Sequence, residues 1–328
     1  MQYDHRSAGA HAARPPSRRV RRPRRAWRRR SQRAQVSAVA TILGLLLVVV
    51  FIANYISTTL PSQMGQNDLQ HGVLVQNQVA QFGALLQAYS SADAVGAQVS
   101  APLTLGSAGA PPFSAPDSST ILPLVNQSSL QVAFSVTGPS TPSRTISVST
   151  LSSPCSTTYC GGSGFQVALH NTYAPSAVVA YEQGAVLYVQ PTSIPVFISP
   201  PTLSFSQNAF TMFVPQFFNS SVTPEQGTGT AELSLRLLSV QQFSFPSNGF
   251  SLQSGSSVTV TVVSPYVAGW YSYFQTIPSL APYLACPSSA CTQLYSTNGP
   301  VGTLTITLPA SQVQSFSLVV GAFSFKVA

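Results

Sequence analysis

Apolar residues first form an unbroken run near the N-terminus. Residues 36–56 contain no charged residue and no proline, and most of them are aliphatic. A bilayer core is crossed by about 20 such residues in a helix. The run therefore predicts a helix that is apolar on every side and long enough to span a membrane.

The next apolar pattern is one-sided. Val75, Val79, Phe82, Leu86 and Tyr89 are separated by steps of four and three residues, and glutamines occupy most of the other faces. This spacing is typical of a helix with an apolar stripe, which we call the α-stripe. We expect it to pack on the protein's own domain. A contact between subunits is the alternative, and both can hold along different parts of the stripe.

The two patterns together predict one long N-terminal helix over residues 35–90. Pro61 separates its halves, and proline lacks the N–H that an α-helix interior requires, so a bend or short break is expected there. Residues 91–125 are rich in Pro, Ser, Ala and Gly and are expected to form an irregular connection.

From residue 126 onward the apolar period changes to two. Short alternating segments are separated by Gly, Pro, Ser and Asn: "QVAFSV", "TISVST", "FQVALH", "AVVAYE", "AVLYVQ", "ELSLRL", "SVTVTVV", "TLTITL" and "FSLVVGAFSFKV". Such spacing favours an antiparallel β-sandwich or barrel over residues 126–328. The predicted fold class is α+β, a long hydrophobic N-terminal helix followed by a β-domain.

Most of the positive charge of the chain is concentrated at the N-terminus. Residues 1–34 hold 12 of the 15 Lys and Arg residues and one of the seven acids, a net charge of +11 within a total of +8. Basic residues beside a span on its cytoplasmic side follow the positive-inside rule. Nucleic-acid binding is the alternative use of such a tail, but the adjoining span explains the arginines without it. Arg29 and Arg30 also match the twin-arginine export signal, but such a match carries little information in a segment so rich in arginine.

The rest of the chain has few charges. Only 7% of all residues are charged, against about 25% in typical soluble domains. Low net charge favours association, and a fold with six carboxylates has little stability to lose when acid protonates them. These points suit a surface protein that packs against its own copies. They also suggest, as a hypothesis, an acidic habitat.

The junction between the basic segment and the apolar run decides what the helix is for. A removable secretory signal has an apolar region of about 7–15 residues followed by an A-x-A type site. The run here is longer, and its exit "IANYISTTLPSQM" has no such site. A retained span and a cut at the junction remain as interpretations.

The junction motif is similar to a known leader. Arg33-Ala34-Gln35-Val36, followed by Ser37 and the apolar helix, resembles the class III leader of archaeal type IV pilins, archaellins and their pilin-like relatives. In that family a membrane aspartic peptidase, the prepilin peptidase, cuts after a small residue that follows a basic one. The resemblance implies that the bond between Ala34 and Gln35 is cut.

The same resemblance implies a function. The mature protein would be a structural subunit of a type IV pilus-like surface filament, assembled through its apolar helix and displaying the β-domain for adhesion. Its partners would be membrane lipid before assembly, copies of itself or related pilins, and the prepilin peptidase. Its N-terminus would be cytoplasmic and its β-domain extracellular. The alternatives are a single-pass surface binding protein that does not polymerise and a minor pseudopilin of a secretion or uptake system.

Four cysteines form two pairs of equal spacing, Cys155 with Cys160 and Cys286 with Cys291. In an exported domain thiols oxidise, so two local disulfides are expected. Pairing between the two loops stays open. A metal centre built from both pairs is the alternative, but neither pair has a histidine beside it.

Two motifs suit an exported domain. Asn126 and Asn219 begin N-x-Ser motifs and are candidate glycosylation sites.

One aromatic cluster interrupts the strand pattern. Tyr266, Trp270 and Phe274 lie four residues apart after Pro265, on one face of a predicted short helix. We expect these rings to pack in the core, and a ligand or glycan platform is the alternative. A strand leading into a short Trp-bearing helix also resembles archaeal pilin-like ectodomains.

Catalysis has little support in the sequence. After residue 34 the histidines are His71, on the predicted helix, and His170, at a strand end. The six acids are scattered singly, and no metalloprotease, nucleophile-elbow, P-loop or dinucleotide motif is present. His170 as a catalytic base is the weaker interpretation. We expect no enzymatic activity, no metal or other cofactor, and no small-molecule substrate.

Overall fold

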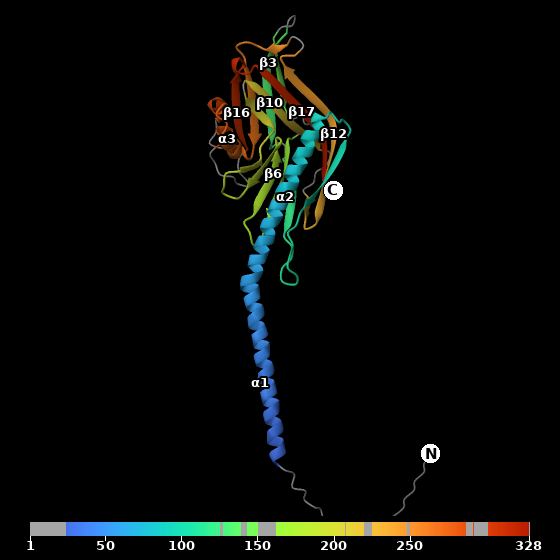
Figure 1. Cartoon of the computed structure of the whole chain (residues 1–328), viewed down its shortest axis with the longest axis vertical. Helices are drawn as coiled ribbons and strands as arrows, with labels where there is room; N and C mark the ends of the chain where they lie inside the picture. The colour runs from blue at the N-terminus through green and yellow to red at the C-terminus, as the bar shows by residue number, and fades with distance from the viewer. Residues whose placement is uncertain are drawn as a thin grey trace, which may run out of the picture. The chain divides into compact units, whose positions relative to one another are not determined.

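The computed structural model describes residues 24–124, 127–138, 143–149, 162–206, 208–219, 225–247, 250–286, 291 and 301–327. For residues 24–35 and 219 it describes the backbone alone. The chain divides into two compact units, residues 1–57 and residues 58–328. Helix α1 belongs to the first unit, and helix α2 and the described strands belong to the second, the β-domain unit (Figure 1).

Helical backbone runs from Arg24 to Ser91, which confirms a long N-terminal helix but begins it inside the basic segment, before the expected start at residue 35. It consists of α1 (Arg24–Asn54), a π-helical turn (Tyr55–Thr59) and α2 (Leu60–Ser91). The interruption expected near Pro61 is this π-helical turn, and the proline follows it in the first turn of α2. A proline is tolerated there because the first N–H groups of a helix have no intrahelical acceptor.

The β-domain unit contains three sheets. Sheet I has the order β1-β12-β17-β10-β9, sheet II the order β11-β2-β5-β6-β7-β8, and sheet III the order β13-β3-β14-β16-β15, with β4 paired to β3. The strands of sheet I are β1 (Gln98–Thr104), β12 (Thr230–Phe245), β17 (Ser315–Val327), β10 (Ala209–Asn219) and β9 (Leu203–Ser206). Those of sheet II are β11 (Glu225–Gly227), β2 (Ser118–Pro123), β5 (Gly164–His170), β6 (Ala177–Glu182), β7 (Ala185–Val189) and β8 (Val196–Ser199). Those of sheet III are β13 (Ser251–Leu252), β3 (Ser129–Thr137), β14 (Ser257–Ser264), β16 (Gly302–Pro309), β15 (Leu284–Ala285) and β4 (Arg144–Ser149).

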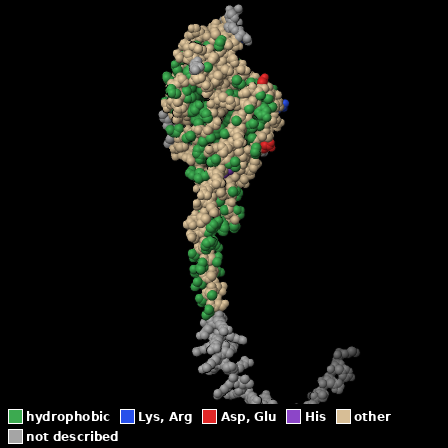
Figure 2. Space-filling view, in the orientation of Figure 1, with side chains coloured by type: hydrophobic (Ala, Val, Ile, Leu, Met, Phe, Trp, Pro, Cys, Tyr) green, Lys and Arg blue, Asp and Glu red, His purple; other side chains and the backbone are tan. Residues whose placement is uncertain are grey.

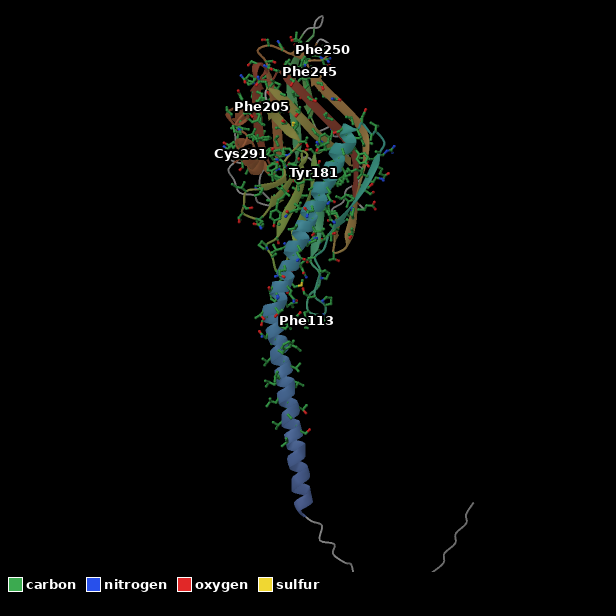
Figure 3. All side chains as sticks on the ribbon, in the orientation of Figure 1. Phe113, Tyr181, Phe205, Phe245, Phe250 and Cys291 are labelled. Atoms are coloured by element: carbon green, nitrogen blue, oxygen red, sulfur yellow. A yellow bond between two sulfur atoms is a disulfide. The ribbon has the colours of Figure 1, made fainter. Side chains whose placement is uncertain are left out.

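The α-stripe packs on sheets I and II. Val75, Val79, Phe82 and Leu86 are buried in one hydrophobic core with residues of β5, β6, β12 and β17. Close approach is possible because residue 83 is a glycine: a Cβ there would lie 2.7 Å from Cε2 of Tyr181 (Figure 3). The expectation that this helix packs on its own domain is therefore confirmed.

A second hydrophobic core lies between the opposite faces of these sheets and sheet III. It joins β3, β14 and β16 to β6, β7, β10 and β17, and it includes helix α3 (Val267–Gln275). Strand β6 contributes to both cores, and all its residues are buried. Sheets I and II thus form a middle layer between α2 and sheet III. Short 3₁₀ helices at Ala281–Tyr283 and Ala310–Gln312 complete the described elements.

The nine alternating segments are all strands, which confirms the β-rich half of the predicted fold. They correspond to β3, β4, β5, β6, β7, β12, β14, β16 and β17. Burial alternates along β14 and β16 as the period of two requires. The overall class, α+β with mostly antiparallel sheets, is as expected.

Two features of the β-domain unit differ from the expectation. The segment 91–125 is not wholly irregular, because β1 and β2 form within it and pair with β12 and β5. Strand β10 has no clean alternation and contains Pro215, yet it lies inside sheet I and pairs in parallel with β17. Both of its faces meet apolar neighbours, since Val214 belongs to one core and Phe213 to the other, and such strands lose the period-two signal.

Candidate membrane and assembly helix

Helix α1 exposes a large apolar surface. Ile42 is 66% exposed, Phe51 is 69% exposed, and the aliphatic residues between them are similarly uncovered. None of the most apolar stretch of this helix is buried against the rest of the chain. By its length and composition it can cross a membrane. Figure 2 shows apolar side chains along its visible face.

The few polar groups of α1 are compatible with an apolar surrounding. Thr41 Oγ1 donates to the Ser37 carbonyl oxygen at 2.9 Å, one helical turn earlier. The Thr41 hydroxyl thus makes its hydrogen bond within the helix. When lipid or other helices surround α1, this donor still has an acceptor. Ala40 and Gly44, four residues apart, lie one above the other, and a Cβ at Gly44 would meet nothing within 4 Å. Small residues at this spacing permit close helix–helix approach.

The proposed cleavage motif lies within helical backbone. Arg33, Ala34 and Gln35 belong to α1, which begins at Arg24, and their side chains are outside the described part of the structure. A peptidase that binds its substrate as an added β-strand would require the first turns of α1 to unwind before cleavage at this position.

The N-terminal half of α2 is fastened to the β-domain by buried polar contacts. Asp68 is fully buried, and its Oδ2 accepts hydrogen bonds at 3.1 Å from the backbone N–H groups of Tyr173 and Ala174. His71 places Nε2 3.0 Å from the carbonyl oxygen of Thr104. Farther along the helix, Gln78 Oε1 accepts the Thr104 N–H at 3.0 Å. These contacts fix the helix to the turn after β5 and to the end of β1.

Both histidines outside the basic segment therefore have structural partners. His71 contacts the end of β1, and His170 Nε2 lies 3.0 Å from Thr120 Oγ1 on the neighbouring strand β2. His170 is a strand-end residue, as the sequence indicates. Among the described residues, no group of three or more His, Cys, Asp or Glu side chains could hold a metal ion.

The aromatic cluster is part of the core. Tyr266, Trp270 and Phe274 are fully buried along one face of α3, which confirms core packing. The alternative of an exposed ligand or glycan platform is wrong for these three rings. Phe197 of β8 packs edge-on against Trp270, with ring centroids 5.0 Å apart.

Trp270 also contacts a buried carboxylate that no sequence motif singles out. Glu182 is fully buried, and its Oε2 accepts hydrogen bonds from Trp270 Nε1 at 2.8 Å and Ser264 Oγ at 2.7 Å. Burial raises the pKa of this carboxyl from 4.5 to about 7, although hydrogen bonds from Trp270, Ser128 and Ser264 act in the opposite direction. Its other oxygen, Oε1, has no hydrogen bond of ordinary geometry among the described residues.

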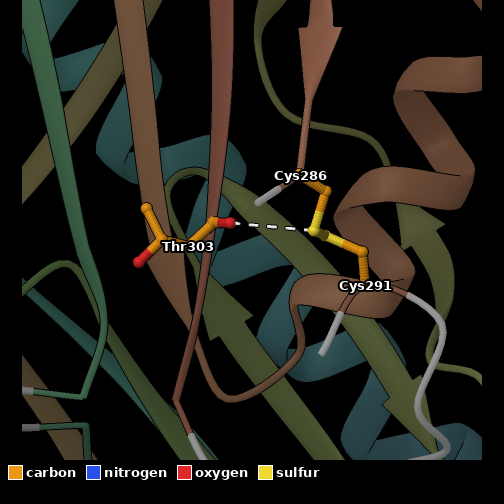
Figure 4. The surroundings of a disulfide bond; sticks show 3 residues. All are labelled: Cys286, Cys291 and Thr303. Carbon is orange, nitrogen blue, oxygen red and sulfur yellow. Dashed lines mark hydrogen bonds between the residues drawn. A yellow bond between two sulfur atoms is a disulfide. The ribbon is translucent and has the colours of Figure 1, made fainter. Parts of the chain in front are cut away.

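One of the two expected disulfides lies in the described residues. Cys286 and Cys291 are bonded to each other, and Cys286 Sγ lies 3.8 Å from the Thr303 carbonyl oxygen (Figure 4). Local pairing is therefore confirmed here, and neither cysteine serves a metal centre or a bridge to the other loop. Cys155 and Cys160 lie outside the described residues.

The two glycosylation motifs are only partly described. Asn126 lies outside the described residues, but Ser128, which completes its motif, is fully buried. Asn219 is the last residue of β10, and its side chain and the rest of its motif are not described. In the folded domain the Ser128 hydroxyl is inaccessible to a modifying enzyme, so any glycan on Asn126 would have to be added before folding.

Comparison with known proteins adds no relative. No protein-family model, no curated protein and no solved structure matches this chain. The candidate site is therefore defined by its own geometry: an uncovered apolar helix next to a basic segment, on a chain whose second unit is a β-rich domain.

Proposed function

We propose that this protein is a structural subunit of a type IV pilus-like surface filament. The subunit assembles through residues 35 to about 60 once the bond between Ala34 and Gln35 has been cut, and it displays the β-domain for adhesion or surface contact. The observation that carries the proposal is the fully uncovered apolar stretch of α1. The role is non-enzymatic and uses no cofactor.

The apolar surface of α1 requires a non-aqueous surrounding. Burying one large aliphatic or aromatic side chain is worth about 1.5–3 kcal/mol, and more than ten such residues of α1 are exposed. A lipid bilayer and a bundle of like helices are equally apolar, so either can cover them. Close approach of copies is favoured at Ala40 and Gly44, where small side chains leave the backbone accessible.

The basic segment determines which of these two surroundings, the bilayer or a helix bundle, α1 can enter. A net charge of +11 over residues 1–34 is compatible with a cytoplasmic tail beside a span. The same charges cannot enter a helix bundle without a large desolvation cost. Removal of the leader would therefore permit transfer from lipid to the filament, and its retention would hold the subunit in the membrane.

The alternative, a single-pass surface protein that keeps its leader and acts alone, is supported by the length of the apolar helix, which suffices for an anchor. A minor pseudopilin of a secretion or uptake system would share the processed helix and would be found at low copy number in a filament made of other subunits.

The deciding experiment identifies the N-terminus of the protein in its native membrane. Trypsin cuts after Arg33, so an unprocessed chain yields a peptide that starts at Ala34 and ends at Arg144. A processed chain yields the same peptide starting at Gln35. Peptide mass analysis is preferable to stepwise sequencing, because an N-terminal glutamine cyclises and blocks the amine.

The matched variants are Ala34→Leu and Ala53→Leu, which make the same change just before the apolar run and near its far end. Ala34→Leu should abolish the peptide that starts at Gln35 and should prevent recovery of the protein in sheared surface filaments. Ala53→Leu should be processed like the wild type. Wild-type protein that keeps Ala34 and never co-purifies with copies of itself would refute the proposal and favour the single-pass anchor.

A further inference from the structure

Four polar side chains meet inside the β-domain, where sheets II and III approach one another. Ser128, Ser163, Glu182 and Gln183 are each fully buried. Gln183 Nε2 donates to Ser128 Oγ at 3.1 Å, and Ser128 Oγ lies 3.1 Å from Ser163 Oγ. The Ser128 hydroxyl also interacts with the Glu182 carboxyl. A hydroxyl, a carboxamide and a carboxyl group are thus in contact and shielded from water.

The backbone at Gln183 is unusual for a residue of its type. Gln183 and Gly184 connect β6 to β7 with φ angles of +54° and +84°. Turns with two positive φ angles favour Asn-Gly or Gly-Gly, and a longer side chain is strained there. The turn is buried, because the Gln183 N–H donates to the Ser163 carbonyl oxygen at 2.9 Å and Gly184 faces Phe213 and Pro215 of β10.

Oε1 of Gln183 is buried and has no hydrogen-bond partner among the described residues, and Oε1 of Glu182 has none beyond the interaction with Ser128. Buried polar atoms are rarely left unpaired, and strained backbone that holds such a group in place often marks a site of chemistry.

We propose that Ser128 and Gln183 become joined by an intramolecular ester bond. Ser128 Oγ attacks Cδ of Gln183, its hydroxyl proton is transferred to the Glu182 carboxylate, and a tetrahedral intermediate forms. The Cδ–Nε2 bond then breaks, and Nε2 leaves as ammonia after receiving the proton from Glu182. The products are one ester and one ammonia, and no oxidant, reductant or cofactor is consumed.

Glu182 is suited to carry the proton in both directions. A group that accepts and then returns a proton is most effective when its pKa lies near the working pH. Burial raises the pKa of Glu182 to about 7, and the hydrogen bonds from Trp270 and Ser264 hold its Oε2 in place. Exclusion of water from the cluster also protects the product ester from hydrolysis.

The ester would connect parts of the fold that only non-covalent contacts join otherwise. Ser128 immediately precedes β3 of sheet III, and Gln183 follows β6 of sheet II. The two residues are 55 positions apart, whereas the Cys286–Cys291 bridge spans five. A cross-link that closes a longer loop restricts the unfolded chain more strongly. This inference does not depend on filament assembly, because it concerns the β-domain alone.

Tryptic digestion of the full-length protein tests the link directly. Among residues 35–328 trypsin can cut only after Arg144, Arg236 and Lys326. Ser128 therefore lies in the peptide ending at Arg144, and Gln183 lies in the peptide 145–236. After reduction of disulfides, the two peptides should remain joined, with a mass one ammonia below their sum. Hydroxylamine, which cleaves esters, should separate them. Cyclisation of Gln35 also releases ammonia but joins no peptides.

Variants identify the reacting groups. Ser128→Ala and Glu182→Gln should yield separate peptides while near-ultraviolet circular dichroism still shows a folded domain, and the matched control Ser163→Ala should remain linked. Wild-type peptides that separate on reduction alone, with the Gln183 amide intact, would overturn the proposal. A link that survives in Ser128→Ala and is lost in Ser163→Ala would show that the nucleophile is wrongly assigned.

Discussion

Glu182 is a carboxyl group whose surroundings favour its neutral form, and this gives the domain a definite pH dependence. In the unfolded chain the group titrates near 4.5, and burial raises its pKa to about 7 in the folded state. The folded state therefore binds the additional proton between these values. The contribution to stability is complete below pH 4.5, declines as the pH rises, and is lost above pH 7, amounting to about 3 kcal/mol at most.

Glu182→Gln should remove this dependence, because the amide keeps an acceptor for Trp270 and Ser264 but does not titrate. Calorimetric unfolding of each protein at pH 4 and at pH 8 measures it. We expect the wild type to lose stability over this interval and the variant to change much less. Comparing the pH dependence within each protein excludes any constant offset from the substitution. A wild-type domain that becomes more stable as the pH rises would contradict the assignment, and would also weaken the hypothesis of an acidic habitat.

At the scale of residues, sequence patterns located the apolar positions well and the buried polar ones poorly. Val75, Val79 and Phe82 were predictable because each helical turn returns them to one face. Glu182 ends the segment "AVVAYE" and looks like a residue at the exposed end of a strand. Its burial arises because the following turn is covered by β10, a strand distant in sequence. No local signal reports such a long-range contact.

At the scale of elements, short apolar segments bounded by turn residues were sufficient to predict nine strands, including β6, which is buried on both faces. Strand β10 was missed because it combines two covered faces with an internal proline, Pro215, and so shows neither alternation nor an uninterrupted apolar run. Strands β1 and β2 were missed because their segment is rich in Pro and Ser, and β1 is an edge strand in which little is buried. Pairing with distant partners, not local propensity, makes these segments strands.

Helix α1 offers a test of assembly that leaves the subunit itself unchanged. A Cβ at Gly44 would meet no atom within 4 Å outside the adjoining helical backbone, so Gly44→Leu should not disturb the monomer. The substitution should raise helix propensity, since glycine is unfavourable in helix interiors. If copies approach closely at this position, the added bulk should cost about 1–3 kcal/mol per contact, or roughly a 5- to 150-fold loss in association.

Chemical cross-linking in native membranes, together with the yield of sheared filaments, measures this effect. The matched control is Val49→Leu, which adds one methylene to an exposed aliphatic residue of the same helix away from the Gly44 face and should assemble normally. Membrane insertion and leader processing should be unaffected in both variants. Equal filament yields for Gly44→Leu and the wild type would exclude close packing at this position.

At the scale of the whole molecule, the two units have separate roles in stability and in association. Every buried hydrophobic residue of the described chain lies at or after Leu60, so both hydrophobic cores belong to residues 58–328. The apolar stretch of α1 contributes nothing to these cores.

A fragment comprising residues 58–328 should therefore fold, remain soluble and unfold at nearly the temperature of the full-length protein, because it retains α2 and all the sheets. If assembly depends on the apolar helix, the fragment should be monomeric in analytical ultracentrifugation and should not enter filaments made by the intact protein. A fragment that forms ordered polymers by itself would place the assembly surface on the β-domain and would remove the main argument for the function proposed for α1.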